Sequence, residues 1–183
     1  MIKRKSGCRQ LEELMRRESR REKGVYMKKW QYYIAYGSNL NIGQMAGRCP
    51  EAEIVGTGKL KQYELEFRGR AGNAHATITK QEGGEVPVLL WRISTEDEKR
   101  LDVYEGYPKY YDKETMEVEV DGKLYEAMVY RMQPGYERNL PSLFYYQTIK
   151  SGYQTLGFSE EVLQRAVLKD AEEQEAVFEQ QLE

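Results

Sequence analysis

The 183-residue sequence has very little histidine and cysteine, the residues on which many metal sites and nucleophilic active sites depend. His75 is the only histidine, which excludes most zinc sites and every Ser-His or Cys-His arrangement that does not use it. Cys8 and Cys49 are too few, and too far apart in the sequence, to indicate a disulfide framework or a thiolate metal site. We therefore expect a reducing, cytoplasmic location and acid-base chemistry carried by carboxylates or tyrosines.

Long apolar runs are also missing. A membrane-spanning helix needs about 18 or more consecutive apolar residues, and the sequence has no such run, so we expect no membrane span. The basic N-terminus is not followed by an apolar segment, so we expect no secretory signal. What the sequence does have is 32% charged and 40% hydrophobic residues, with 15 tyrosines, which is the composition of a globular protein. This length suits one domain with a sizeable core.

Charge is distributed unevenly along the chain. Residues 1–29 contain 11 Lys or Arg and 4 Asp or Glu, a net charge of +7, whereas residues 30–183 carry a net charge of −9. The basic segment has one short apolar stripe, so we predict a helical or flexible N-terminal extension followed by a domain over 30–183 with a C-terminal helix. The lack of interleaved aromatic residues favours a solvated extension. The alternative is that this segment binds nucleic acid or an anionic surface. The oligomeric state stays open.

From Trp30 onward, alternating and short apolar runs predict a largely antiparallel sheet. The expected strands cover residues 31–36, 53–57, 60–67, 75–80, 86–93, 114–120 and 123–131. Asp121 and Gly122 predict a two-residue hairpin turn, because both residue types accept a positive φ. Gly83 and Gly84 predict a second hairpin.

Helix signals are fewer than strand signals. In the first helix, Asn39 or Asn41 is the expected cap and Pro50 marks the end. Ser94 and Asp97 form a capping-box pattern for a second helix, which is expected to end at Gly106. A third helix is expected over 141–153, closed by Gly152, and a fourth after the cap Ser159. Their inner faces are expected to contain Phe144, Ile149 and one or both of Tyr145 and Tyr146 in the third, and Val162, Leu163, Ala166 and Val167 in the fourth. The sum is an α+β fold whose sheet curls towards a barrel, with flanking helices.

The segment "YGSNL", Tyr36 to Leu40, follows an apolar strand directly. Glycine and small side chains let a ligand approach consecutive backbone N–H groups, so such a loop can hold a carboxylate or a developing oxyanion. The alternative is an ordinary strand end in which Asn39 only caps the next helix.

Glu105 lies among aromatic residues in "LDVYEGYPKYY". A carboxylate between aromatic rings loses hydration, which raises its pKa and makes it a better proton acceptor near neutral pH. The alternative is a solvated residue at the end of a helix.

The ordered motifs resemble the γ-glutamylcyclotransferase-like (AIG2-like) family over Tyr33 to Gly157. The resemblance rests on "YGSNL" followed by "RCP", "ATI" at 76–78, "LLWRIS" at 89–94, "LDVYEGY" at 101–107, "AMVYRM" at 127–132 and "PSLFYYQTIKSGY" at 141–153. It implies a small mixed, mostly antiparallel β-barrel with flanking helices. It also implies cyclisation of a γ-glutamyl group to 5-oxoproline with release of the attached amine, which needs no metal or organic cofactor.

The resemblance assigns roles to individual residues. Glu105 matches the catalytic acid-base, and the substrate-binding residues would be Tyr36, Gly37, Ser38, Asn39, Leu40 and Tyr145. Retention of both the serine and the asparagine of the loop favours a γ-glutamyl amino acid or γ-glutamyl acyl donor as substrate. A non-catalytic module that binds a γ-glutamyl or related small metabolite is the alternative. By contrast, the residues themselves favour structural roles for His75, Cys49 and Arg48.

Overall fold

The computed structural model describes residues 29–180 of the chain. The basic extension predicted for residues 1–29 lies outside this range except for its last residue, and so does Cys8. Within the described residues, no helix is long and apolar enough to cross a membrane.

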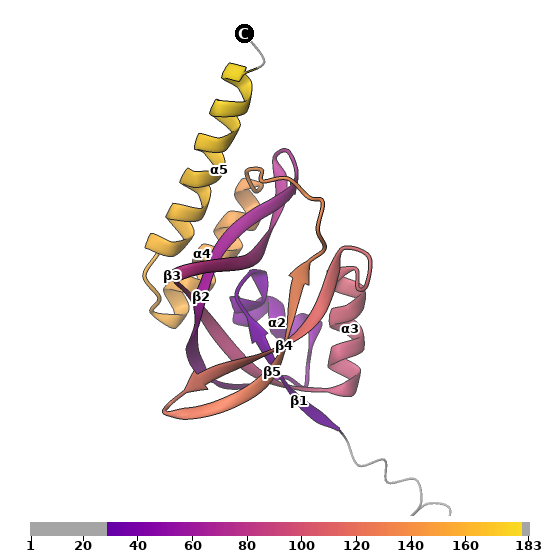
Figure 1. The fold of residues 1–183 in the computed structure, drawn as a ribbon. Coiled ribbons are helices and arrows are strands. Elements are labelled where there is room, and N and C mark those ends of the chain that lie inside the picture. Colours follow the sequence, from indigo (N-terminus) through magenta and orange to yellow (C-terminus); the bar gives the residue numbers. More distant parts are fainter. Residues whose placement is uncertain (1–28, 181–183) are drawn as a thin grey trace, which may run out of the picture.

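A closed five-stranded barrel forms the centre of the fold (Figure 1). Its strands are β1 (Trp30–Ala35), β2 (Glu53–Arg70), β3 (Asn73–Ser94), β4 (Tyr111–Val120) and β5 (Lys123–Met132). They are arranged in the order β1-β3-β2-β4-β5, and the parallel pairing of β1 with β5 closes the ring, whereas the other pairs are antiparallel. The predicted mixed, mostly antiparallel barrel is confirmed.

The two longest strands each join two strands that the sequence predicts separately. Residues 53–57 and 60–67 both belong to β2, and residues 75–80 and 86–93 both belong to β3. The join within β2 is irregular, since register shifts follow Ile54 and Lys61. Local polar residues therefore mark bulges here rather than strand ends.

The hairpin predicted at Gly83 and Gly84 is wrong. The chain reverses instead at residues 71–72, where Gly72 has φ +69°. Gly83 also has a positive φ, +71°, but it lies in a bulge opposite Gln62, whose side-chain oxygen accepts a hydrogen bond from the Gly83 amide at 2.9 Å. Glycine supplies the same backbone freedom to a bulge as to a turn, so its presence does not distinguish the two. The other predicted turn is confirmed, with φ of +50° at Asp121 and +74° at Gly122.

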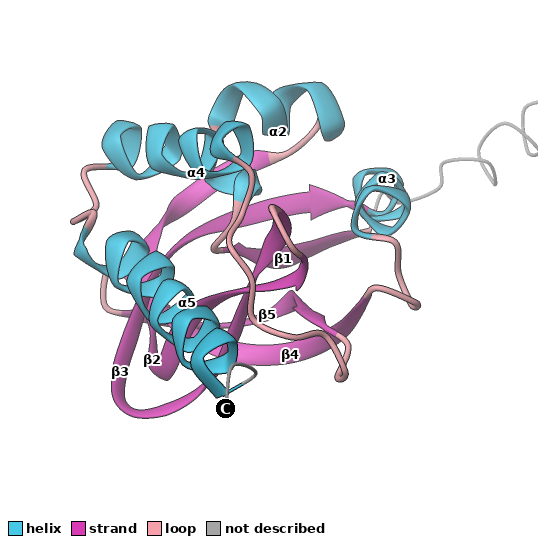
Figure 2. Ribbon diagram, turned by 90° about the horizontal axis from the view of Figure 1, so that it is seen from above, coloured by secondary structure: helices cyan, strands magenta, loops and turns pink. Residues whose placement is uncertain are grey.

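Helices flank the barrel on several sides (Figure 2). They are the short 3-10 turn η1 (Ser38–Leu40) and the helices α2 (Ile42–Arg48), α3 (Thr95–Glu105), α4 (Leu143–Leu156) and α5 (Glu161–Gln180). In Figure 2, α2 and α4 lie along one side of the barrel, α5 runs beside β2 and β3, and α3 stands apart from α5 near the other end. The turn η1 follows β1 directly and contacts both α2 and α4, so these three elements lie close to the end of β1.

Helix starts follow the sequence closely. Asn41, rather than Asn39, caps α2, because its side-chain oxygen accepts a hydrogen bond from the Gln44 amide at 3.0 Å. The capping box of Ser94 and Asp97 opens α3 as predicted, and Gly106 ends it with φ +67°. This leaves the Asn39 side chain available for other contacts.

Two expectations for α4 are wrong. The helix continues past Gly152 to Leu156 and ends at Gly157, which has φ +70°. Gly152 is instead required for close packing, because a Cβ there would lie 2.7 Å from the Cβ of Leu40. Phe144 is 78% exposed rather than buried, because Ile149 and Tyr153 form the inner face. In α5 the predicted inner face is confirmed, with Leu163 and Ala166 buried.

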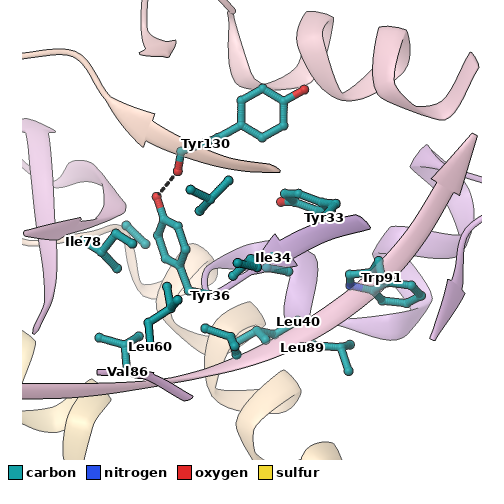
Figure 3. Packing of buried hydrophobic residues seen from close by; sticks show 14 of the residues in the cluster. Tyr33, Ile34, Tyr36, Leu40, Leu60, Ile78, Val86, Leu89, Trp91 and Tyr130 are labelled. Carbon is teal, nitrogen blue, oxygen red and sulfur yellow. Dashed lines mark hydrogen bonds between the residues drawn. The ribbon is translucent and has the colours of Figure 1, made fainter. Parts of the chain in front are cut away.

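The core fills the barrel and the space under the helices (Figure 3). Ile34, Leu89 and Ile78 are buried, and Leu40 packs among them from the turn after β1. Figure 3 also shows the Tyr36 side chain crossing the barrel interior, where its hydroxyl donates to the backbone oxygen of Tyr130 at 2.6 Å. Tyrosine can be buried here because its hydroxyl finds a partner.

Candidate active site

A small cavity opens where β1 passes into η1. It is lined by Tyr33, Tyr36, Gly37, Ser38, Asn39, Ala76, Glu105, Tyr111, Tyr130 and Tyr145. A neighbouring depression shares four of these residues and adds His75, Tyr104 and Tyr110. Tyr104 is 45% exposed, so this depression is the side from which a ligand would enter. Segments far apart in the sequence therefore converge on one small site.

The loop after β1 is held in a tight turn. The Leu40 amide donates to the backbone oxygen of Gly37 at 3.0 Å, and the Leu40 side chain is fully buried. Gly37 faces the cavity, where an added Cβ would lie 3.3 Å from the Cβ of Ala76 and 3.4 Å from the Tyr145 hydroxyl. Glycine therefore keeps space open beside the loop backbone.

Glu105 brings a carboxylate to the cavity from the last residue of α3. Its Oε1 accepts a hydrogen bond from Nδ2 of Asn39 at 2.9 Å. Burial among the surrounding tyrosines raises the pKa of Glu105 to about 7, although the positive charge of Arg48 and the Asn39 hydrogen bond both act to lower it. The carboxyl group can therefore gain and lose a proton near neutral pH.

The Asn39 side chain connects several groups of the site. Nδ2 also donates to the Tyr33 hydroxyl at 2.8 Å, and Oδ1 accepts from a guanidinium nitrogen of Arg48 at 2.6 Å. The backbone oxygen of Asn39 accepts from the indole nitrogen of Trp91 at 3.2 Å. A buried asparagine with these partners is a fixed part of the site rather than a helix cap.

Arg48 lies directly behind Asn39, at the end of α2. Its guanidinium donates to Oε1 of Gln44 at 2.6 Å and lies 3.8 Å from the centre of the Tyr104 ring. The Tyr104 hydroxyl is in turn 3.0 Å from Oγ of Ser38. Arg48 also donates to Oγ of Ser38 at 3.5 Å, so it contacts both Ser38 and Asn39 of the loop without lining the cavity itself.

The cavity tyrosines supply neutral hydroxyl groups. The Tyr145 hydroxyl accepts a hydrogen bond from the Ala76 amide at 3.2 Å, and the Tyr111 hydroxyl donates to the Ala76 backbone oxygen at 2.6 Å. Burial raises the pKa of Tyr33, Tyr36, Tyr111 and Tyr145, so all four stay protonated at neutral pH. Glu105 is therefore the cavity group suited to proton transfer at that pH.

The structure brings together most of the residues assigned from the sequence. Glu105 and Tyr145 line the same cavity as Tyr36, Gly37, Ser38 and Asn39, but the Leu40 side chain is buried in the core away from it. Four lining residues were not expected from the sequence, namely Tyr33, Ala76, Tyr111 and Tyr130, and only a structural role was expected for Arg48. Only alternation along the strands hints at these inward positions, and the same pattern describes core residues. Among residues 29–180, no group of three or more His, Cys, Asp or Glu could hold a metal ion.

Comparison with known proteins identifies the family. Residues 33–153 match the model of the family described as "Gamma-glutamyl cyclotransferase, AIG2-like". The chain is 29% identical over 134 residues to the gamma-glutamylcyclotransferase of Bos taurus, covering 68% of this chain and 71% of that protein. It is 30% identical over 139 residues to that of Mus musculus, covering 70% and 73%. A solved structure of a gamma-glutamyl cyclotransferase aligns with a TM-score of 0.68 and 26% identity, covering 75% of this chain and 86% of that one. The chain belongs to the γ-glutamyl cyclotransferase, AIG2-like family.

Proposed function

We propose that this protein is a γ-glutamyl cyclotransferase that converts a γ-glutamyl amino acid or γ-glutamyl acyl donor to 5-oxoproline and the released amine. The observation that carries the proposal is the Glu105 carboxyl group, which faces a small cavity opposite a glycine loop and has a pKa of about 7. Family membership supports the general activity. The choice of substrate and the mechanism rest on the chemistry of the site.

The reaction needs a proton acceptor more than a protein nucleophile. The nitrogen of the substrate's α-amine attacks the γ-carbonyl carbon, and the bond from that carbon to the leaving amine then breaks. Holding the amine beside the carbonyl gives the large effective molarity of an intramolecular reaction. Glu105 takes the proton that the attacking amine loses and returns it to the departing nitrogen, so the enzyme ends in its starting protonation state.

The glycine loop binds the negative charge of the substrate or intermediate in this proposal. The Leu40 amide is already used within the turn, which leaves the amides of Gly37, Ser38 and Asn39 as donors. These hold the α-carboxylate or stabilise the oxyanion that forms during attack, an effect commonly worth about 3 kcal/mol per donor. The neutral hydroxyl of Tyr145 lies close to the same loop.

Release of 5-oxoproline from a panel of γ-glutamyl compounds tests the proposal. Wild-type protein should convert at least one member, and Glu105→Gln should lose this activity while keeping the wild-type circular dichroism spectrum. Glu96→Gln is a matched control, since Glu96 is an exposed residue of the same helix that pairs with Lys99. It should leave the activity unchanged.

Two outcomes would contradict the proposal. The first is full activity of the folded Glu105→Gln variant, which would remove the carboxylate from the mechanism. The second is tight binding of γ-glutamyl compounds to the wild-type protein with no product formed, which would instead indicate a non-catalytic binding module.

A further inference from the structure

The side chain of Arg48 is fixed on several sides. One guanidinium nitrogen donates to Oδ1 of Asn39 at 2.6 Å, and another donates to Oε1 of Gln44 at 2.6 Å. Nε2 of Gln44 is held in turn by Oγ1 of Thr148 on α4 at 3.4 Å, and the guanidinium lies over the ring of Tyr104. These contacts place the guanidinium against one end of the Asn39 amide, and the same nitrogen makes a longer contact, 3.5 Å, with Oγ of Ser38.

Arginine restricts the orientation of the asparagine because a guanidinium can only donate hydrogen bonds. The acceptor end of the Asn39 amide must therefore face Arg48, and the donor end must face the opposite way. On that side Nδ2 lies 2.9 Å from Oε1 of Glu105 and 2.8 Å from the Tyr33 hydroxyl. Without the guanidinium, the amide could turn over and present its oxygen to Glu105, which would disfavour the ionised carboxylate.

We propose that Arg48 is a positioning residue for the reaction, because it holds the Asn39 side chain in the orientation in which its amide donates to the Glu105 carboxylate. Its part in catalysis rests on the function proposed above, but the orientation itself does not. Arg48 is not among the residues that line the cavity, and its shortest hydrogen bond to a lining residue is the one to Asn39. Its charge adds a second effect of the same sign, since it lowers the pKa of Glu105.

Several other ionisable groups lie around Glu105. The groups that interact with it or share its two pockets are Tyr33, Tyr36, Cys49, Tyr104, Tyr110, Tyr111, Tyr130, Tyr145, His75 and Arg48. Burial raises the pKa of Cys49 and of most of these tyrosines, and it lowers the pKa of His75 below its usual 6.5. Because the pKa of Glu105 is about 7, an acidic limb near pH 7 in the rate profile is assigned to Glu105.

The test compares the pH dependence of kcat/KM for wild type, Arg48→Met and Arg48→Lys. Methionine keeps contact with the Tyr104 ring but removes the charge and the hydrogen-bond donors. Lysine keeps the charge but lacks the planar guanidinium that donates to two acceptors at once. We expect the acidic limb of Arg48→Met to move upward by about one pH unit, which lowers kcat/KM about tenfold at pH 6 and little at pH 9. We expect Arg48→Lys to fall between it and wild type. The titration of the substrate amine is common to all three enzymes and cancels.

A purely structural role of Arg48 predicts a different profile, in which kcat/KM falls equally at every pH and the limb stays in place. That result for Arg48→Met would overturn the proposal. Arg48→Lys with a limb identical to wild type would also contradict it, because charge alone would then explain the effect. If Arg48→Met does not fold, the Arg48→Lys comparison decides.

A second measurement does not depend on turnover. In protein labelled with ¹³C at the glutamate carboxyl carbons, the Glu105 signal is assigned by its loss in Glu105→Gln and then titrated. A pKa of Glu105 that is higher than in wild type in both Arg48→Met and Arg48→Lys supports the positioning role even if no γ-glutamyl compound is a substrate, because Arg48→Lys keeps the charge. An unchanged pKa would contradict it.

Discussion

Glu66 and Glu105 are two inward-facing carboxylates of the same protein with opposite electrostatics. Burial acts to raise the pKa of both groups. Glu66 on β2 is only 2% exposed, yet its pKa is lowered, because Arg68 donates to it at 2.5 Å, Thr79 donates at 2.7 Å and Arg138 forms a further short contact. Among the described residues, the Glu105 carboxyl group accepts one side-chain hydrogen bond, from the neutral amide of Asn39. Its pKa is raised to about 7.

The difference shows that burial alone does not make a proton-transfer group. A buried carboxylate with charged donors on its oxygens is stabilised as the anion and remains ionised at any physiological pH. A partly buried carboxylate that faces a cavity and keeps an oxygen available for a ligand is poised between its two forms. The number and charge of the direct partners therefore separate a structural carboxylate from a catalytic candidate in this fold.

The largest expected effect is on activity. Glu105→Gln should lower kcat/KM for 5-oxoproline formation by about 10²- to 10⁴-fold, the usual contribution of a general acid-base, with little loss of stability. Glu66→Gln should retain most of its activity when assayed at a temperature at which it is folded. Steady-state kinetics on both purified variants checks this contrast, which fails if the two variants lose activity equally.

Stability should show the reverse contrast. Glu66→Ala leaves Arg68 and Arg138 without their shared carboxylate, and breaking such a buried ion pair typically costs about 3–5 kcal/mol. Glu64→Gln is the matched control, because Glu64 lies on the same strand and also pairs with Arg138 but is more exposed. It should cost no more than about 1 kcal/mol. Urea denaturation at pH 7 measures both, and equal losses would show that Glu66 has no special structural role.

The pH dependence of stability should separate the two carboxylates by sign. The raised pKa of Glu105 means that the folded state binds more protons than the unfolded state between pH 4.5 and about 7, so Glu105 lowers stability as the pH rises through this range. Relative to wild type, Glu105→Gln should gain up to about 3 kcal/mol above pH 7 and nothing below pH 4.5.

Glu66 has a lowered pKa, so its stabilisation is present above pH 4.5 and is lost as the pH falls through the lower folded value. Denaturation curves of Glu66→Gln should therefore approach wild type only in acid. Parallel profiles for the two variants would contradict the assigned pKa directions.

The smallest effect concerns the space beside Glu105. Gly37→Ala puts a methyl group 3.3 Å from the Cβ of Ala76 and 3.4 Å from the Tyr145 hydroxyl, inside the cavity. We expect KM to rise about tenfold with a stability cost of about 1 kcal/mol. Gly47→Ala is the control, because an added Cβ there meets nothing within 4 Å. A change in KM for Gly47→Ala that matched Gly37→Ala would show that the effect does not arise in the cavity.

Much of the fold could be predicted from short stretches of sequence. The Asp121–Gly122 turn, the Ser94 capping box and the end of α3 at Gly106 are correct because each depends on the backbone preferences of a few adjacent residues. The hairpin at Gly83 and Gly84 and the helix end at Gly152 fail for one shared reason. Glycine permits a turn, a bulge or a close helix contact equally, and only the partner segment selects among them.

The sequence by itself determined the strand and helix types, the loop after β1 and, through ordered motifs, the family to which the chain belongs. It could not determine that Asn39 contacts Glu105 instead of capping α2, or that Arg48 stands behind it. Those contacts join η1, α2 and α3, and desolvation of Glu105 depends on tyrosines from four further elements. Propensity and periodicity act over a few residues, whereas the pKa of a carboxylate is set by every group within several ångströms in space. The sequence therefore named Glu105 as the candidate, whereas the tertiary structure decided which contacts set the pKa of its carboxyl group to about 7.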